Sequence, residues 1–375
     1  MEQETLCRLA LIQIPGIGDL FAKLLTEYFN GAKYLFCSSR KELALIPGVG
    51  VSLLRNLTSK KVRDDVFFKA SQELTFTEKH NINIMFFDGE KYPEKLKGLD
   101  DSPFVLFYKG TEALWKKKIL SVVGTRKATG YGEDITKKIV DDFMNKDILI
   151  VSGLAYGIDT FAHKFSVENN ISTVGVLAHG LDRIYPHRNK KLAEKMLENG
   201  GLLTEFFSGT IPARENFPKR NRIVAGISDA TIVVEATVKG GALITAKIAN
   251  SYNRDVLAVP GRVIDFYSEG CNLIIKNQQA VLVESGQDIL NALNWNETID
   301  VFENKNQLDL FGMLSKEEVA ILNILKNSGM INKERLAIQL NKKLSILSGV
   351  LFNMELNGLI KALPGNNYQL KVMRK

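Results

Sequence analysis

The sequence predicts an α/β protein with an extended Rossmann-like, doubly wound and mostly parallel sheet. A helix-hairpin-helix domain is expected before this sheet and a winged-helix domain after it. Two observations predict the sheet. Between about residues 118 and 285, apolar β-branched runs alternate with segments of helical periodicity, a pattern typical of parallel strands joined by helical crossovers. Several of these runs also end in glycine-rich turns, and such sheets bind ligands outside the carboxyl ends of their strands.

Composition is that of an ordinary globular protein. The 375 residues are 45% hydrophobic and 24% charged, which favours two or three domains. The net charge of +7 favours an anionic partner, but 49 basic against 42 acidic residues is a modest excess. Three distant cysteines offer no zinc site, so we expect no metal and no cofactor. The sequence shows neither a signal peptide nor a membrane span, which predicts a cytoplasmic protein with no membrane contact.

Residues 1–78 are predicted to form a small helical domain. The turns PGIG at residues 15–18 and PGVG at residues 47–50 each lie between apolar helical segments. This is the pattern of a helix-hairpin-helix, whose outward backbone N–H groups can hold a DNA phosphate. Few basic residues surround the two turns, so mutual packing of the hairpins is an equal alternative.

Residues 79–295 are predicted to form the main domain. Short β segments at about residues 83–110 lead into buried runs such as KILSVVG, ILIVSG and ATIVVEA. The turns after these runs contain neither GxGxxG nor GxxxxGK[ST], which argues against a dinucleotide site and a P-loop. What remains is a crevice of glycine turns with one arginine, Arg126, and such turns admit a sugar-phosphate backbone closely.

The segment from residue 215 to 247 is the most informative. A helix is predicted to begin near Pro218, and three cations lie in its first turns: Lys219, Arg220 and Arg222. Cations at a helix N-terminus oppose the macrodipole, which is unfavourable unless an anion binds there. A solvated basic helix end is the alternative. With the stackable Phe217 alongside, we favour a bound anion.

Several acids and one histidine could suggest catalysis. Glu205 and Glu235 end apolar strands, and Asp159 lies four residues before His163 on one predicted helix. Carboxylates at strand ends can serve as catalytic groups or pair with nearby arginines, and we favour ion pairs and hydrogen bonds. No nucleophile accompanies them, so we predict no catalytic residues.

The end of the chain is predicted to be a separate module. Residues 296–312 are polar and without periodicity, as expected of a linker. Residues 313–375 show three helices and a strand pair, a winged-helix pattern that often reads DNA. The third helix carries Glu355 and no Lys or Arg after Lys343, so we favour protein contact over duplex recognition.

Linked motifs in order resemble the DNA processing protein A family, DprA or Smf. These are SVVGTR, SGLAYGID followed by AH, NFPKRNRIVAGISDATIVVEA, GGALITA, and AVPG followed by GCNLI. The resemblance implies a single-stranded DNA-binding protein that protects incoming DNA and loads the RecA recombinase during natural transformation. It also implies a homodimer without enzymatic activity, and a SAM-like character for the N-terminal domain.

The resemblance also implies a DNA pocket, which we predict together with Phe217 as a stacking ring. Its residues are Gly124, Thr125, Arg126, Ser152, Gly153, Phe217, Lys219, Arg220, Asn221, Arg222, Gly240 and Gly241. Two alternatives stay open. A nucleotide phosphoribohydrolase-like enzyme could use Glu235 or Glu205, although VKGGALITA lacks the proline and the acid of that family's loop. A scaffold that contacts only proteins is the other alternative.

Overall fold

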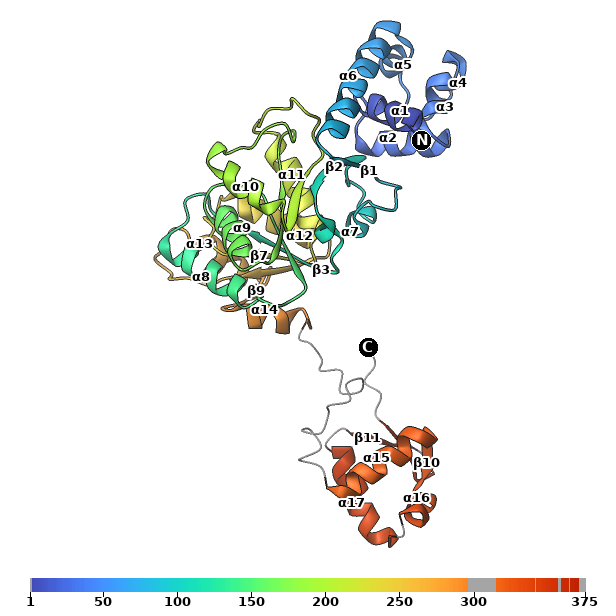
Figure 1. Cartoon of the computed structure of the whole chain (residues 1–375), viewed down its shortest axis with the longest axis vertical. Helices are drawn as coiled ribbons and strands as arrows, with labels where there is room; N and C mark the ends of the chain where they lie inside the picture. Colours follow the sequence, from blue (N-terminus) through green and yellow to red (C-terminus); the bar gives the residue numbers. More distant parts are fainter. Residues whose placement is uncertain (1, 296–314, 341, 357–358, 364, 371–375) are drawn as a thin grey trace. The chain divides into compact units, whose positions relative to one another are not determined.

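The computed structural model describes residues 2–295, 315–340, 342–356, 359–363 and 365–370 (Figure 1). The chain divides into two compact units, Met1–Trp295 and Asn296–Lys375. The predicted helical and main domains both fall within the first unit. The predicted linker at residues 296–312 lies outside the described residues.

The first unit begins with a helical region, as predicted. Its helices are α1 (Glu2–Ile12), α2 (Asp19–Tyr28), α3 (Ala32–Cys37), α4 (Arg40–Ala44), α5 (Val51–Thr58) and α6 (Lys60–Lys79). Both predicted glycine turns are present. Gly16 and Gly48 have φ angles of 96° and 89°, which L side chains rarely adopt, while Gly18 and Gly50 are the N-caps of α2 and α5. Each turn therefore joins two helices, as the sequence pattern requires.

A nine-stranded sheet follows, and the predicted mostly parallel α/β sheet is confirmed. Its order is β1-β2-β6-β5-β4-β3-β7-β8-β9. Its antiparallel pairs are β1 with β2 and β2 with β6. The strands are β1 (Asn83–Phe86), β2 (Val105–Gly110), β3 (Lys118–Val123), β4 (Ile148–Ser152), β5 (Ser172–Val176), β6 (Gly200–Thr204), β7 (Ala230–Val233), β8 (Asp255–Ala258) and β9 (Val281–Leu282).

Helices cover both faces of this sheet. On one face α11 and α12 pack on Val123 and Val151, and on the other α8, α9 and α14 pack on Val122 and Ile150. None of the described helices is long and apolar enough to cross a membrane. The helical elements are α7 (Glu94–Lys97), η1 (Glu112–Trp115), α8 (Gly130–Asp141), α9 (Ile158–Glu168), η2 (His187–Asn189), α10 (Lys190–Met196), α11 (Asn216–Ile227), α12 (Gly241–Ser251), α13 (Glu269–Lys276) and α14 (Gly286–Ala292).

The direction of the strand order reverses at β3. From β3 the chain builds β4, β5 and β6 on one side, and then returns to build β7, β8 and β9 on the other. The loops that leave β3, β4 and β7 therefore diverge from one point at the carboxyl edge of the sheet. Such a reversal opens a crevice between the crossover connections, and ligands of open α/β sheets bind there.

The second unit has its own core. Three helices, α15 (Lys316–Ser328), α16 (Lys333–Gln339) and α17 (Leu344–Leu356), pack around buried Leu325, Leu336 and Leu351. An antiparallel sheet of order β10-β12-β11 completes it, with β10 (Met330–Asn332), β11 (Ile360–Leu363) and β12 (Asn367–Leu370). The sequence predicted the helices and the last strand pair but not β10, whose three residues are too few to show a period.

The tight pairing of β6 with β5 predicts a specific requirement for glycine at position 200. A Cβ atom on Gly200 would lie 1.9 Å from the carbonyl oxygen of Thr173. Because backbone cannot move aside as a side chain can, we expect Gly200→Ala to lower the free energy of unfolding by roughly 1–3 kcal/mol. Urea unfolding followed by tryptophan fluorescence measures this in the first unit, which contains both tryptophans, Trp115 and Trp295.

A glycine in open space supplies the control for this measurement. Gly98 has a φ of −80°, and a Cβ atom there would meet nothing within 4 Å. Gly98→Ala should therefore leave the urea midpoint unchanged or slightly raised. Equal losses of stability in the two variants would contradict the steric explanation.

Candidate functional site

A cleft of about 380 Å³ lies where β3, β4 and β7 end. It is bounded by the loops after these strands and by the first turns of α11 and α12. Nine of the predicted site residues line it: Gly124, Thr125, Arg126, Gly153, Phe217, Arg220, Asn221, Gly240 and Gly241. The reversal of the strand order thus brings together residues that lie up to about 120 positions apart in the sequence.

Four further polar residues line the cleft and were not predicted as site residues: Asp159, Arg214, Thr237 and Thr245. Arg214 lies in the loop before α11, where the sequence shows no helical or strand period. The one signal that could have identified it is that it is a further cation close to the start of this helix. Thr245 lies four residues after Gly241, and this spacing puts both on one face of α12. The cleft therefore has three arginines, at positions 126, 214 and 220.

Arg220 forms the buried part of the cleft wall. Its side chain is only 4% exposed, and its Nη1 donates to the carbonyl oxygen of Val176 at 3.1 Å. Gly153 makes room for it, because a Cβ atom there would lie 1.4 Å from Nη1. The Nε–H of Arg220 has no hydrogen-bond partner in the described part of the chain. A buried donor without an acceptor is costly, so this group lowers the stability of the free protein.

Asp159 is buried beside Arg220, and its role is structural. Its Oδ2 accepts from the N–H groups of Gly153 and Ala155 at 3.2 and 3.4 Å. Burial raises the pKa of Asp159, and the charge of Arg220 opposes that rise. His163 instead shares a hydrogen bond of 2.7 Å with Thr173, and burial lowers its pKa to about 3. Asp159 thus takes the structural role that we favoured from the sequence.

Two N–H groups of the loop after β3 are occupied by Glu235. Glu235 accepts from the N–H and hydroxyl of Thr129 at 3.0 and 2.5 Å, and its carbonyl accepts from Thr125 N–H at 2.7 Å. The start of α12 differs, because its N-cap, Gly240, offers no side-chain cap. Within the described residues, the N–H groups of Gly241 and Ala242 donate to no acceptor. An uncapped helix start that lines a cleft is suited to an anion.

Aromatic rings form one side of the cleft. The guanidinium of Arg126 lies 4.8 Å from the centroid of the Phe217 ring, a cation–π contact, and Tyr185 meets Phe217 edge to face at 6.4 Å. Behind Phe217, His179 and Tyr156 help to line a second hollow of about 20 Å³. Phe217 therefore presents a ring between the two spaces, with a cation against it.

The other predicted site residues do not line the cleft. Ser152 is buried, and its hydroxyl donates to the carbonyl of Val122 at 2.6 Å. Lys219 is exposed, and Arg222 is directed away from the cleft. At 100° per residue, positions 219 and 222 of a helix share one face while position 220 turns to another. The three cations therefore do not surround a single anion, and DNA contact by Lys219 or Arg222 stays a prediction.

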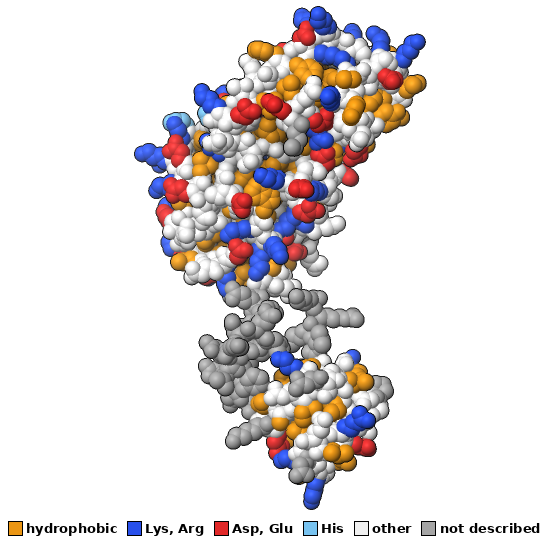
Figure 2. Space-filling model, turned by 45° about the vertical axis from the view of Figure 1, so that its right-hand side comes forward, with side chains coloured by type: hydrophobic (Ala, Val, Ile, Leu, Met, Phe, Trp, Pro, Cys, Tyr) orange, Lys and Arg blue, Asp and Glu red, His pale blue; other side chains and the backbone are white. Residues whose placement is uncertain are grey.

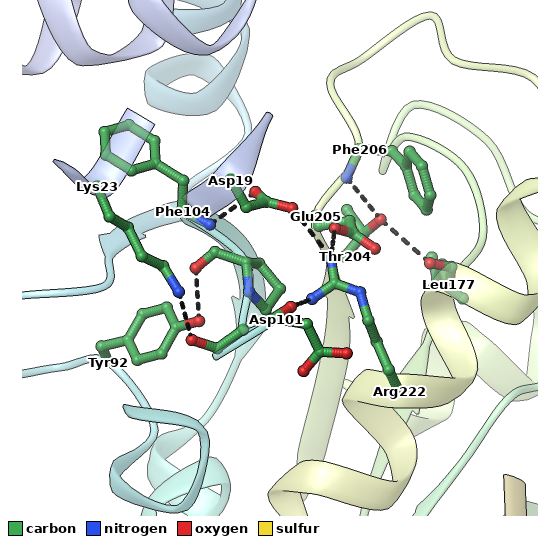
Figure 3. Close-up of polar contacts among 12 residues, drawn as sticks. Asp19, Lys23, Tyr92, Asp101, Phe104, Leu177, Thr204, Glu205, Phe206 and Arg222 are labelled. Atoms are coloured by element: carbon green, nitrogen blue, oxygen red, sulfur yellow. Dashed lines mark hydrogen bonds and ion pairs between the residues drawn. The ribbon is translucent and has the colours of Figure 1, made fainter. Parts of the chain in front are cut away.

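Arg222 instead connects α11 to the N-terminal helical region (Figure 3). Its Nη2 contacts Asp19 at the start of α2, at 3.2 Å, and also the carboxylate of Glu205 just after β6. Its Nη1 donates to the carbonyl of Asp101. Asp19 also accepts from the N–H of Phe104 at 2.8 Å. We call this group of Asp19, Asp101, Glu205 and Arg222 the α11 joint. Glu205 thus has the ion-pair role favoured from the sequence.

The charge on the face of the first unit seen in Figure 2 is mixed. Figure 2 shows basic and acidic side chains interspersed over the visible face, without a continuous basic field. No group of three His, Cys, Asp or Glu in the described residues could hold a metal ion. The concentration of arginines in the cleft is therefore a local feature, and the cleft is the candidate functional site.

Comparisons with known proteins agree with this fold. A family model described as DNA recombination-mediator protein A matches residues 83–294. Protein Smf of Synechocystis is 35% identical over 283 residues, which are 74% of this chain and 70% of that protein. DNA processing protein DprA of Streptococcus pneumoniae is 41% identical over 199 residues, 53% of this chain and 70% of that protein.

Two solved structures are also similar. The X-ray structure of DNA processing protein A from Streptococcus pneumoniae superposes with a TM-score of 0.62 at 30% identity, over 78% of this chain and 98% of that one. A structure of DNA processing protein A from Helicobacter pylori, which concerns the single-stranded DNA binding mode of that protein, gives 0.52 at 27% identity. It covers 57% of this chain and 96% of the other.

The α11 joint predicts a pH dependence of stability. Burial raises the pKa of Glu205 from 4.5 to about 7, although Arg222 and Lys219 lower it, and Asp19 and Asp101 add to the rise. Because the folded protein holds this proton more tightly than the unfolded chain, the contribution of Glu205 to stability is fully present below pH 4.5 and is lost as the pH rises through 7. We expect Glu205 to contribute a fall of up to about 3 kcal/mol in the free energy of unfolding.

Glu205→Gln removes this titration and keeps the shape of the side chain. Urea unfolding at pH 5 and pH 8, followed by tryptophan fluorescence, should show that the variant gains stability relative to the wild type as the pH rises. Glu198→Gln, at an exposed position, is the control and should follow the wild type at both pH values. A difference between Glu205→Gln and wild type that is the same at both pH values would contradict the assignment.

Proposed function

The chain belongs to the family of DNA recombination-mediator protein A, the DprA/Smf DNA processing proteins, and on that basis we propose that its cleft binds single-stranded DNA. One observation supports this most directly: three arginines and an uncapped helix start line the cleft, and its one acid, Asp159, is engaged by backbone N–H groups. Such donors suit phosphate oxygens, because arginine binds them through a planar fork.

The shape of the cleft favours a single strand over a duplex. A volume of about 380 Å³ between loops cannot hold a double helix, whereas a flexible strand can pass one unit at a time into it. Phe217 offers a ring on which any base can stack, since every base has a π face. These donors contact phosphates rather than base edges, so binding is expected to tolerate any sequence.

We further propose that the protein protects incoming single strands and loads the RecA recombinase onto them during natural transformation. The recombination-mediator family supports this role. We propose that it acts in the cytoplasm as a homodimer. The second unit is proposed to be a winged helix that contacts protein, because α17 has no Lys or Arg and exposes Phe352 and Leu356. The first helical region is likewise proposed to be a SAM-like helix-hairpin-helix domain.

We propose a binding function without catalysis. The acids at the strand ends already have partners: Glu205 contacts Arg222, and Glu235 accepts from Thr129. A phosphoribohydrolase-like enzyme would need one of these carboxylates free to act on a bound nucleotide. Release of free base from a nucleoside monophosphate, measured by chromatography, would support the enzyme instead.

Single-stranded DNA binding predicts a defined mutational response. We expect Arg126→Ala and Arg214→Ala each to weaken binding of a labelled oligonucleotide by about tenfold, because each removes a charged hydrogen-bond donor. Fluorescence anisotropy at several salt concentrations gives the slope of log binding constant against log salt concentration. The magnitude of this slope should fall by about 0.7 for each phosphate that the variant no longer neutralises. Lys219→Ala tests whether the strand extends beyond the cleft.

Lys41→Ala is the control for these variants, because Lys41 is exposed on α4 in the helical region. It should bind like the wild type. A duplex that binds as well as the single strand, or wild-type affinity in both arginine variants, would show that the cleft is not the DNA site.

Removal of the second unit tests its proposed role. A chain that ends at Trp295 keeps the whole first unit, so we expect its affinity for single strands to be unchanged within about twofold. If the second unit contacts the recombinase, RecA-catalysed strand exchange on DNA coated with single-strand binding protein should no longer be stimulated. Full stimulation by the shortened chain would assign the recombinase contact to the first unit.

A further inference from the structure

We infer that the second unit binds a second copy of this chain through helix α17, with the two helices antiparallel. The inference deepens the proposed function, because it rests on the proposed role of the second unit in protein contact and names the partner. Three features of α17 lead to it. They are an apolar face that its own unit leaves uncovered, the order of small and large residues on that face, and the lack of charge along it.

Helix α17 has two apolar faces, and its own unit covers one of them. Leu347, Leu351 and Met354 are buried in the core of the second unit. Phe352 and Leu356 lie on the opposite side of the helix and are 60% and 70% exposed. The exposed row, which we call the outer seam, is Ser345, Gly349, Phe352 and Leu356. Its spacing of four, three and four residues is that of helices that pair along their length.

The order of residues along the outer seam fits a second copy of the same seam. Read from the N-terminus, two small residues, Ser345 and Gly349, precede two large ones, Phe352 and Leu356. When two such seams meet antiparallel, Phe352 faces Gly349 of the second copy, and Leu356 faces its Ser345. A parallel pair would place large residues on large and small residues on small. The seam is therefore self-complementary in the antiparallel direction, as a two-fold contact between identical surfaces requires.

Gly349 supplies the space for the ring of Phe352. Its φ is not positive, and a Cβ atom built on it would meet nothing within 4 Å. Neither the backbone nor the packing of the described part of the unit therefore requires glycine at this position. Glycine inside a helix is less favourable than most other residues. A large side chain from a second helix, packed against this bare stretch of backbone, gives the glycine a role.

The lack of charge along the outer seam also favours this partner. Helix α17 has one charged residue, Glu355, whose carboxylate accepts from the N–H of Ala362 at 3.0 Å. Phosphates of a nucleic acid would find no cation on this helix. A charged protein surface would have to bury its charges unpaired. An identical uncharged seam avoids both costs, and antiparallel helices place opposite ends of their dipoles side by side.

Disulfide trapping in the full chain tests the contact and its direction. Ser345→Cys and Leu356→Cys chains are mixed under oxidised glutathione, each with Cys37→Ser because Cys37 is an exposed cysteine. We expect a disulfide-linked dimer of the two different chains on a non-reducing gel, because positions 345 and 356 face each other. Each chain alone should give at least about tenfold less dimer, since identical positions lie about 16 Å apart along the antiparallel helices.

Two results of this experiment would overturn the inference. One is the absence of a linked dimer in the mixture. The other is equal linkage in the mixture and in either chain alone, which would indicate random collision or a parallel pair. Asn323→Cys, at an exposed position of α15, is the control. Mixed with the Ser345→Cys chain, it should give no more linked dimer than either chain alone.

Gly349→Leu separates this contact from general apolar attraction. The leucine has free space in the single chain and is a better helix former, so the melting temperature should stay or rise. In the pair it occupies the place of Phe352 from the second copy, so the yield of linked dimer should fall by about tenfold. A surface that attracts partners by apolar area alone would give more dimer with leucine, and that result would contradict the outer seam.

Phe352→Ser tests the large residue of the same layer. The ring is exposed in the single chain, so its removal leaves the core of the unit intact, and the yield of linked dimer should fall by about tenfold. Ile338→Ser, at a position of α16 that is 79% exposed, is the matched control and should leave the yield unchanged. Equal yields in the two variants would contradict the position of Phe352 in the contact.

The inference and the proposed function fail in different ways. If the chain that ends at Trp295 no longer stimulates RecA and the mixture gives no linked dimer, the second unit contacts the recombinase and the inference is wrong. If the linked dimer forms as expected and the shortened chain stimulates RecA fully, the contact between copies stands and the proposed recombinase contact of the second unit is wrong.

Discussion

The position of Arg220 over Gly153 is the contact on which the cleft depends. A guanidinium can occupy this buried place only because residue 153 has no Cβ atom. Its charge is balanced by Asp159, which in turn holds the N–H groups of the loop after β4. One packing contact therefore places a buried cation beside the crevice and closes the loop around it. The topology of the sheet produces the crevice, and this contact places a positive charge in its wall.

Helix α11 carries a second arginine with a different task. Arg220 faces the cleft, while Arg222 holds Asp19 and Glu205 in the α11 joint (Figure 3). The same helix is therefore fixed on one side to the N-terminal helical region and exposed on the other to the proposed ligand. Any shift of α2 against the sheet would move α11, and with it Phe217 and Arg220. The helical region thus stabilises the geometry of a cleft to which it contributes no lining residue.

Sequence periodicity was sufficient to predict the architecture, but it did not predict which way the side chains of the site point. The glycine turns after the strands led to six residues of the cleft, because parallel strands must end at one edge, and the other three came from the predicted helix start and the family resemblance. The grouping of Lys219, Arg220 and Arg222 followed from their closeness in sequence, and a helix turns such neighbours to different faces. Arg214 was missed because a loop carries no period. The contact between Asp19 and Arg222 could not be predicted, because residues 203 positions apart leave no local signal in the sequence.

The unpartnered donor of Arg220 is more than a missing hydrogen bond. Leaving a buried donor without an acceptor costs about 1–3 kcal/mol, a large part of the stability of a typical domain. A chain selected for stability alone would replace the Arg220–Asp159 pair with apolar residues, which is often neutral or favourable. The presence of this buried pair beside an uncapped helix start favours a cleft that serves an anionic ligand. On this view part of the stability of the free protein is given up to keep a cation in the wall of the cleft.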